Sequence, residues 1–515
     1  MITTETPHQA ASSTRATIPI LAAAQVARVS SEALERARAL LAELESLPLD
    51  QVSVESVLDA WDQTSMVLED AFGAISLLNS VHPDKDVRDA SDVALVQESS
   101  FLTDVFQNEA FYERVRRVAP ESVAAREMQK HLLEAFEDSG VSLAPEKRQR
   151  YKEISDRLTE LGQEFAKNIR ENETRIRFTP EECRGLPQSW LDRVPRDTEG
   201  NYVVGFDYPD YIPFLMNAHD EAARRRYWTE NTLRGTPRNL DVMDEIVTLR
   251  KEIAELYEVP SYAHYVTKRR MVENPATVSR FLDEVRSVVT EAEVRDLAEL
   301  AELKRELTGA TGEVRIERWD VTYYRERLRE RRYAIDQEEL RKYFPSEPTV
   351  RWMLDISERL YGLRFERADV PVWHEEVIYL DVLDAPTDAF IGGIYLDLYP
   401  RDGKYKHAAA WPVRGVSKRT GRKPISVLVT NFDRKGLTHD ELETLLHEFG
   451  HVLHGVLSDT HYVGHAGTSV ERDFVEAPSQ MYEEWASRME SLSLLQNHCS
   501  ECPRVDASLV ERLNA

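Results

Sequence analysis

Cysteine is scarce in this chain, with only Cys183, Cys499 and Cys502 among 515 residues. So few thiols exclude the dense disulfide framework of small secreted domains and favour a reducing, cytoplasmic location. Cys499 and Cys502 form a C-x-x-C beside His498. Neither a second ligand pair nor a thioredoxin-like context accompanies this motif, so we interpret it as incidental.

Long apolar runs are missing as well. No segment approaches the roughly 18 consecutive apolar residues that a membrane-spanning helix needs, so no membrane partner is expected. The first 19 residues are rich in Ser and Thr and contain no apolar core segment. They resemble neither a secretory nor an organellar signal, and we predict that 1–19 form a flexible tail.

Positive charge is in short supply. Lys and Arg number 65 against 91 Asp and Glu, which gives a net charge of −26. Such a field repels phosphate backbones and anionic headgroups, so nucleic acid is excluded as an expected partner. Apolar residues make up 42% and charged residues 30%, a balance typical of a soluble globular protein.

The hydrophobic pattern is mainly helical. Helical periodicity runs through 20–177, for example along Ile154, Leu158, Leu161 and Phe165, and returns over 211–307 and 323–343. A Pro- and Gly-rich stretch from 178 to 210 is the clearest domain boundary, with a short strand expected at 202–206. Clusters of β-forming residues between 365 and 431 predict a small sheet within a mainly α fold.

The segment after Gly436 carries the chemistry. Thr438 and Glu441 form a capping box that predicts a helix start, and Gly455 is a plausible terminator. Between them, apolar residues occupy most of the helix circumference, which predicts that the helix is buried. His447, Glu448 and His451 interrupt this apolar surface as an H-E-x-x-H motif.

The spacing of the motif suits a metal ion. Side chains at i and i+4 lie on one helix face about 5–6 Å apart, so His447 and His451 can both reach one Zn²⁺. Glu448 is rotated by about 100° from His447 and flanks the metal, where it can act as a general base. Burying such polar groups without partners would be costly, so their presence calls for a compensating ion or hydrogen bonds.

A catalytic zinc needs a third protein ligand. Thr468 and Glu471 form a second capping box, which predicts another helix carrying Glu476, with Pro478 bending it soon after. Spacing alone makes Glu476 only one candidate. The other candidates are Glu471, Asp473, Glu483, Glu484, His454, His461 and His465.

Two segments, 437–451 (LTHDELETLLHEFGH) and 467–481 (GTSVERDFVEAPSQM), closely resemble the thimet oligopeptidase and neurolysin family of zinc metallopeptidases. The resemblance extends through 148–171, 319–324 and 395–407. It implies that His447, His451 and Glu476 hold one Zn²⁺ per chain and that Glu448 is the catalytic base.

The resemblance also implies a fold: a large, mainly α, zincin-type metallopeptidase with a small β-sheet beside the active site and two lobes around a deep channel. Short unstructured peptides are the implied substrates, and an edge strand can hold them. The strand near 395–408 and the loop 464–468 would line the channel. The implied substrate-binding residues are Tyr399, His407, Ala408, Gly464, Gly467 and Thr468.

Family members continue past the point equivalent to Ala515, and that part supplies channel wall and tyrosines that stabilise the oxyanion. We therefore expect an N-terminal helical region over 20–177 and a catalytic region over 178–515, with the zinc site at 437–485, C-terminally incomplete relative to the family.

The expected function is a monomeric zinc-dependent oligopeptidase, and the form of 403–408 favours the endopeptidase branch. The alternatives are a catalytically impaired zinc- or peptide-binding homologue, a peptidyl-dipeptidase of the same family, and a helical scaffold without stoichiometric zinc.

Overall fold

The computed structural model describes residue 15, residues 17–333 and residues 337–514. Most of the predicted flexible tail lies outside this range. Two residues of its described part contact the sheet, and Arg15 forms an ion pair with Asp381 of β4. The backbone N–H of Ile18 donates to the Tyr395 hydroxyl at 3.1 Å.

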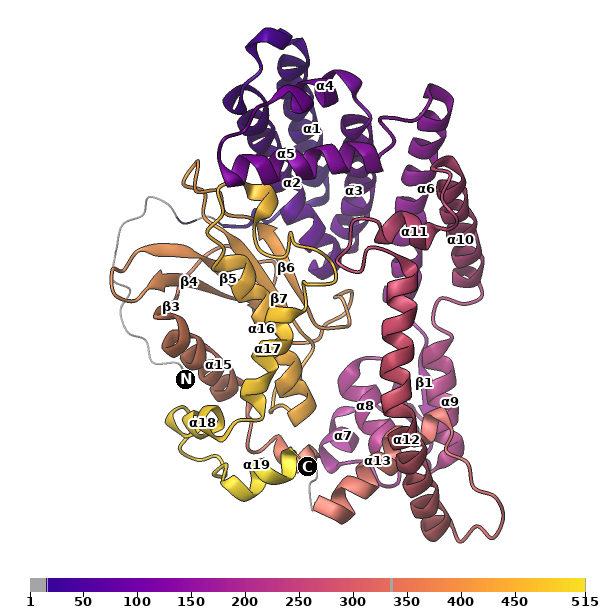
Figure 1. The fold of residues 1–515 in the computed structure, drawn as a ribbon. Helices are drawn as coiled ribbons and strands as arrows, with labels where there is room; N and C mark the ends of the chain where they lie inside the picture. The colour runs from indigo at the N-terminus through magenta and orange to yellow at the C-terminus, as the bar shows by residue number, and fades with distance from the viewer. Residues whose placement is uncertain (1–14, 16, 334–336, 515) are drawn as a thin grey trace.

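The N-terminal part is a bundle of helices (Figure 1). After α1 (Ala23–Ser46), a short 3₁₀ turn (Leu49–Gln51) and a π-helical turn (Val54–Asp59) lead into α2 (Ala60–Val81). The bundle continues with α3 (Lys85–Phe106), α4 (Glu109–Arg117), α5 (Val123–Asp138) and α6 (Pro145–Arg170). The predicted stripe on α6 contributes buried Ile154 and Leu161, which pack against α10.

A second lobe follows. Strands β1 (Ile176–Phe178) and β2 (Tyr202–Val204) pair antiparallel, which confirms the predicted short strand. Around them lie α7 (Gln188–Arg193), α8 (Tyr208–Asn217) and α9 (Glu221–Thr232), whereas α10 (Arg238–Leu256) packs beside α6. Helices α12 (Pro275–Thr308) and α13 (Arg318–Tyr333) complete the lobe. Helix α11 (Tyr262–Thr267) connects α10 to α12, and Leu340 of α14 (Gln337–Leu340) joins the core around α16. The core of the second lobe is aromatic, and the Phe214 ring contacts those of Phe178, Trp190 and Tyr227.

The predicted sheet has five strands in the order β3-β4-β5-β7-β6. They are β3 (Leu363–Arg367), β4 (Ile378–Asp384), β5 (Phe390–Asp397), β6 (Ala409–Arg414) and β7 (Ile425–Val429). The β5–β7 pair is parallel and the other pairs are antiparallel. Side chains alternate between the faces of β7: Val427 and Val429 join the core of the N-terminal bundle, whereas Leu428 joins the core around α16.

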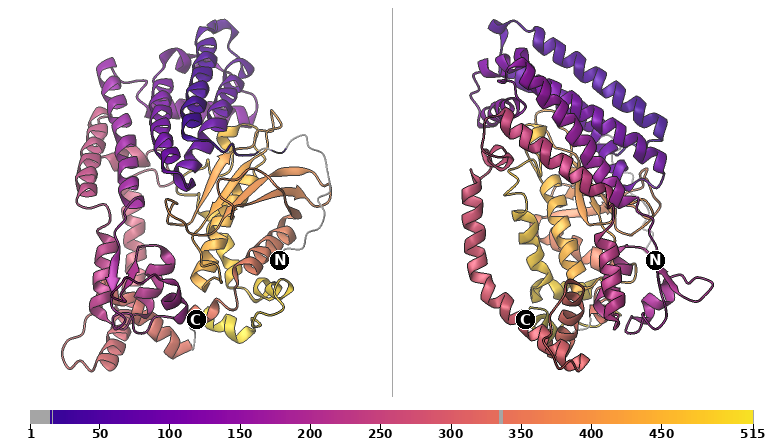
Figure 2. Two further views of the ribbon diagram at one scale, coloured as in Figure 1. Left: turned by 180° about the vertical axis from the view of Figure 1, so that it is seen from behind. Right: turned by 90° about the vertical axis from the view of Figure 1, so that its right-hand side faces the viewer.

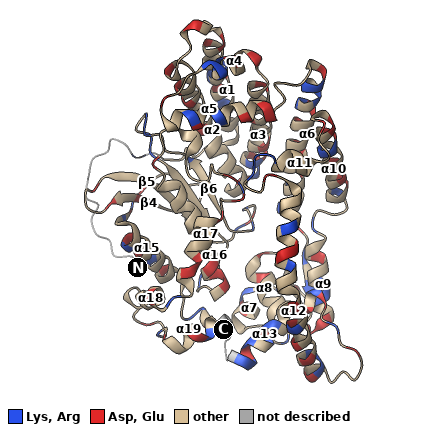
Figure 3. Cartoon of the chain, in the orientation of Figure 1, with Lys and Arg blue, Asp and Glu red and all other residues tan. Residues whose placement is uncertain are grey.

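The sheet therefore lies between two helical layers. The N-terminal bundle covers one face, and α15 (Ser346–Tyr361) with α16 (His439–Val456) packs on the other (Figure 1). Charged residues of both signs are spread over the helices, while the strands are largely uncharged (Figure 3). This arrangement confirms the predicted mainly α fold with a small sheet.

The chain ends in short helices: α17 (Ala477–Glu483), α18 (Met489–Leu492) and α19 (Ala507–Leu513), with 3₁₀ turns at Val463–His465, Glu484–Ala486 and Ser493–Asn497. Leu509 and Val510 of α19 join the core around α16. The structure joins Cys499 and Cys502 in a disulfide, so our interpretation of this pair as incidental was wrong.

The long helix α12 runs along one side of the second lobe (Figures 1 and 2), and most of its residues before Leu300 are exposed to solvent. Near its C-terminal end, Leu300 and Leu303 pack against Tyr323 and Tyr324 of α13. Upstream on the same face, apolar side chains are exposed, namely Phe281, Leu282, Val285, Val288 and Val289. None of the helices in the described part of the chain is long and apolar enough to cross a membrane.

Candidate metal centre

Helix α16 forms as the sequence predicts. The Glu441 amide donates to the Thr438 hydroxyl at 3.2 Å, and the Thr438 amide donates to the Glu441 carboxylate at 2.8 Å, so the capping box is complete. The apolar residues of α16 are buried against the sheet and α17. The prediction for Gly455 was wrong: α16 runs to Val456, and a Cβ at Gly455 would lie 2.4 Å from the Ser426 hydroxyl oxygen.

The two histidines of the motif lie side by side on α16. Their ring centroids are 5.0 Å apart, and the rings are nearly perpendicular at 84°. The Nε2 atoms of His447 and His451 lie 3.3 and 2.9 Å from the same carboxylate oxygen of Glu476. One donor atom from each of the three side chains thus falls within 4.8 Å of the others, a group that could hold a metal ion.

Glu476 reaches this position from the start of α17. The expected helix from Thr468 was wrong, because 472–476 are turns and α17 begins only at Ala477. Pro478 lies in the first turn of α17, where its missing N–H costs nothing, so it does not bend the helix. Burial would raise the pKa of Glu476, but the hydrogen bond from Ser479 and the two imidazoles outweigh it and lower the pKa.

The rival ligands have other partners. Glu483 lies 2.5 Å from Nδ1 of His447, on the side of the ring away from Glu476. Glu471 pairs with Arg270 at 3.5 Å, and Asp473 accepts from the Val272 amide at 3.1 Å. The only signal in the sequence for the Glu483 contact is that Glu483 follows Glu476 by seven residues, about two helical turns.

The remaining histidines of this region also have other neighbours. The ring of His465 contacts that of His131 with centroids 5.0 Å apart, and His461 stacks edge-on against Tyr462 at 4.6 Å. His454 belongs to neither of the possible metal-holding groups found among the described residues. The second such group, His439, Asp440 and Glu443, lies in the first turn of α16, where Nε2 of His439 contacts the Ala486 carbonyl at 3.1 Å.

Glu448 points toward the edge of the sheet. Burial is the main cause that raises the pKa of Glu448, and the nearby Glu476 carboxylate raises it further. His447 and a hydrogen bond from the backbone N–H of Ala410 act in the opposite direction. Because Ala410 belongs to β6, the carboxylate that would serve as base is fixed beside the edge strand.

The residues expected to bind substrate lie on two loops. Tyr399, His407 and Ala408 belong to the connection from β5 to β6, where Nδ1 of His407 lies 2.5 Å from the hydroxyl of Tyr208 in the second lobe. Arg434 stacks on the Tyr399 ring at 5.0 Å. Tyr395, at the start of the stretch expected to line the channel, is fully buried in β5, an inner strand of the sheet.

The second loop follows α16. Gly464 is exposed, Thr468 is half-buried, and Gly467 is buried with φ of +56°. The Gly467 amide donates to the Ser458 hydroxyl at 2.7 Å. A Cβ at Gly467 would lie 2.9 Å from the Cα of Gly455, so the two glycines allow this loop to pack on α16.

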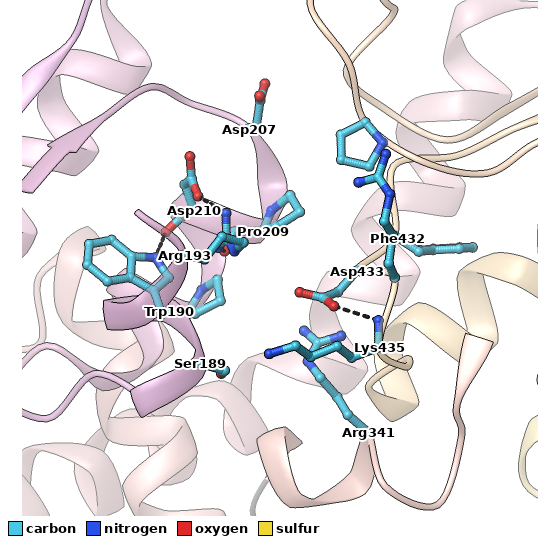
Figure 4. A pocket seen from close by; sticks show the side chains of 13 residues that line it. Ser189, Trp190, Arg193, Asp207, Pro209, Asp210, Arg341, Phe432, Asp433 and Lys435 are labelled. Atoms are coloured by element: carbon cyan, nitrogen blue, oxygen red, sulfur yellow. Dashed lines mark hydrogen bonds and ion pairs between the residues drawn. The ribbon is translucent and has the colours of Figure 1, made fainter. Parts of the chain in front are cut away.

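A cavity of about 270 Å³ lies between the second lobe and the sheet region (Figure 4). One wall comes from α7 and α8 and the other from 432–435 and Arg341. Its arginines are paired: Arg193 with Asp210, Arg341 with Glu441 and Arg434 with Glu376. The histidines of the candidate metal centre do not line it.

Together, a mainly helical fold, a small sheet and an H-E-x-x-H helix facing a downstream glutamate define a zincin-type peptidase fold. A model of Peptidase family M3 matches residues 214–515. The chain belongs to this family, among its oligopeptidases.

Curated relatives agree with this assignment. Thimet-like oligopeptidase of Dictyostelium discoideum is 29% identical, over 94% of this chain and 77% of the relative. Oligopeptidase A of Salmonella typhimurium is 32% identical, over 90% of this chain and 72% of the relative. A crystal structure described as an oligoendopeptidase F from Bacillus anthracis shares the fold, with a TM-score of 0.51 and 12% identity over 94% of this chain and 73% of that chain.

Proposed function

We propose that this chain is a zinc-dependent endopeptidase that hydrolyses short unstructured peptides, with His447, His451 and Glu476 as ligands of one Zn²⁺ and Glu448 as the general base. The observation that carries the proposal is the convergence of the three donor atoms within 4.8 Å. The proposed organisation is a helical region over 20–177 and a catalytic region over 178–515, with the metal centre within 437–485.

The donor set fits zinc. Two imidazole nitrogens and one carboxylate oxygen form a common protein ligand set for catalytic zinc, which leaves a further position open for water or substrate. Ligand histidines usually use their second nitrogen to contact a carboxylate or carbonyl, which fixes the ring. The Glu483 contact to Nδ1 of His447 supports the proposal in this way, and Ser479 holds the Glu476 carboxylate at 3.0 Å.

When bound, zinc would supply a Lewis acid that polarises the scissile carbonyl and lowers the pKa of water. Glu448 accepts a proton from the attacking water at its carboxylate and then gives that proton to the leaving amine nitrogen. The Ala410 N–H holds the Glu448 carboxylate in place next to β6. An extended peptide lying along this edge strand would place its scissile bond beside Glu448.

The test measures zinc content and turnover separately. Glu448→Gln should keep one zinc per chain and lose about 10²–10⁴-fold in the rate of cleavage of an internally quenched peptide. His451→Ala should lose both the bound zinc and the cleavage activity. Glu443→Gln, on the same helix but within the other acidic group, is the matched control and should keep both zinc and activity.

Product analysis separates the alternatives. Internal cleavage products support the endopeptidase, whereas release of C-terminal dipeptides alone identifies a peptidyl-dipeptidase. Stoichiometric zinc without any turnover in the unaltered chain identifies a zinc-binding homologue. Full turnover in Glu448→Gln would refute the assigned role of Glu448.

A further inference from the structure

A second cavity lies where the N-terminal bundle, the second lobe and the loop before β6 meet. It has a volume of about 480 Å³. Residues from α3, the end of α6, the turn after β2, the end of α9 and 402–406 form its wall. Six cationic side chains line it against four carboxylates, although the whole chain carries 26 surplus negative charges: Lys85, Arg88, Arg170, Arg175, Arg234 and Lys406 against Glu171, Glu173, Asp207 and Asp402.

Three of these arginines have no carboxylate partner in the part of the chain that the structure describes. Arg88 donates only to the carbonyls of His82 and Pro83, at 2.8 and 3.0 Å. Arg175 and Arg234 each donate to a neighbouring backbone carbonyl, at 3.2 and 3.1 Å. The arginines of the cavity in Figure 4 are all ion-paired, so the two cavities differ in how their arginines are neutralised.

The fourth arginine is buried in the cavity wall. The Arg170 side chain is 10% exposed, and its Nε and Nη2 atoms have no hydrogen-bond partner among the described residues. Arg170 forms only long ion pairs, with Asp92 and Glu171 at 3.7 and 4.0 Å from Nη2, and both distances exceed that of a hydrogen bond. Burial lowers the pKa of Arg88, and the positive charge of the neighbouring Arg170 lowers it further.

Cationic side chains that face one cavity without close carboxylate partners are costly unless an anion neutralises them. Guanidinium groups present several donors in a plane that match the oxygens of phosphate and carboxylate. We propose that this cavity binds a small oxyanion, held by Arg88, Arg170, Arg175 and Arg234. Its source is either free phosphate or the terminal carboxylate of a peptide, and both place the same oxygen chemistry in the cavity.

The proposal has a consequence for the two lobes. Arg88 and Arg170 belong to the N-terminal bundle, Arg175 follows α6, and Arg234 follows α9 of the second lobe. An oxyanion bound between them contacts both lobes at once and should stabilise their arrangement by mass action. This stabilisation does not depend on the metal centre or on Glu448.

The test uses the full chain and isothermal titration with two probes. Inorganic phosphate is the first probe. The second is a short acetylated peptide with a free carboxylate, compared with its C-terminal amide and measured in the Glu448→Gln background to prevent hydrolysis. Arg175→Gln and Arg234→Gln should each weaken binding of the active probe about 10- to 100-fold, the loss expected for one charge-assisted hydrogen bond.

Arg225→Gln is the matched control, because Arg225 lies on α9, stacks on Trp319 at 5.0 Å and does not line the cavity. It should bind as the unaltered chain does. Phosphate binding identifies free phosphate as the source, and binding of the acid but not the amide identifies the peptide terminus. Absence of binding by both probes at millimolar concentration, or binding that none of the cavity arginines affects, would overturn the proposal.

Discussion

Lys404 offers a sharp test of how the sheet is held together next to the metal centre. Its side chain is fully buried, and its ammonium donates to four oxygens at 2.7–2.9 Å: the carbonyls of Asp397, Tyr399 and Thr430 and the Asp397 carboxylate. These contacts join the ends of β5 and β7 to the loop that leads to β6. We expect Lys404→Met to disrupt this junction.

The size of the stability loss follows from the buried ion pair between Lys404 and Asp397. Removing one partner of a buried ion pair costs about 3–5 kcal/mol, because the other charge is left without compensation. Arg401 still contacts both carboxylate oxygens of Asp397 at 2.7 Å, and the Trp373 indole donates to it at 2.8 Å. These contacts limit the damage, so we expect a loss at the lower end of this range, about 3 kcal/mol.

Urea unfolding followed by tryptophan fluorescence and circular dichroism measures this loss. The matched control is Lys406→Met in the same loop, because Lys406 pairs with Asp207 at 2.8 Å while remaining partly exposed. A surface pair of this kind contributes about 0–1 kcal/mol, so the control should change the midpoint little. If the two substitutions lowered the free energy of unfolding equally, the buried contacts of Lys404 would contribute no more to stability than a surface ion pair.

Two further outcomes are expected. Burial raises the pKa of Glu98 on α3 to about 7, above its usual 4.5. The native state therefore holds a proton that the unfolded state releases between these values, and stability should fall as pH rises through this window. Glu98→Gln should match the unaltered chain near pH 5 and exceed it near pH 8 by up to about 3 kcal/mol in thermal or urea unfolding; a parallel pH dependence of both chains would contradict the assignment. Glu483→Gln should weaken zinc binding about 10- to 100-fold in chelator competition, whereas Glu484→Gln, whose carboxylate pairs with Arg488, should not.

The metal-binding helix could be predicted because its signals are local. The capping box at Thr438 and the apolar periodicity of α16 involve only neighbouring residues, and i to i+4 geometry fixes the two histidines. Glu476 was a candidate by spacing and was singled out only by family resemblance, since its position depends on how the chain returns to α16.

Long-range contacts explain why the prediction for the segment between α16 and α17 was wrong. The capping box expected at Thr468 and Glu471 does not start a helix, because Glu471 turns instead to Arg270 of the second lobe and Asp473 caps the Val272 amide. The edge strand β6 was not predicted, because Pro412 weakens the β-strand pattern of its sequence. An edge strand nevertheless tolerates proline. The attachment of Arg15 and Ile18 likewise depends on residues more than 360 positions away.

The open apolar face of α12 bears on how the protein behaves in concentrated solution. Copies of a chain with 26 surplus negative charges repel one another, which keeps Phe281, Val285 and Val288 of different molecules apart. Dissolved salt shortens the range of this repulsion to about 10 Å at 0.1 M, while the hydrophobic attraction between the exposed apolar side chains persists. Colloidal stability should therefore decline as ionic strength rises, and dilute buffer is the favourable medium for handling the protein.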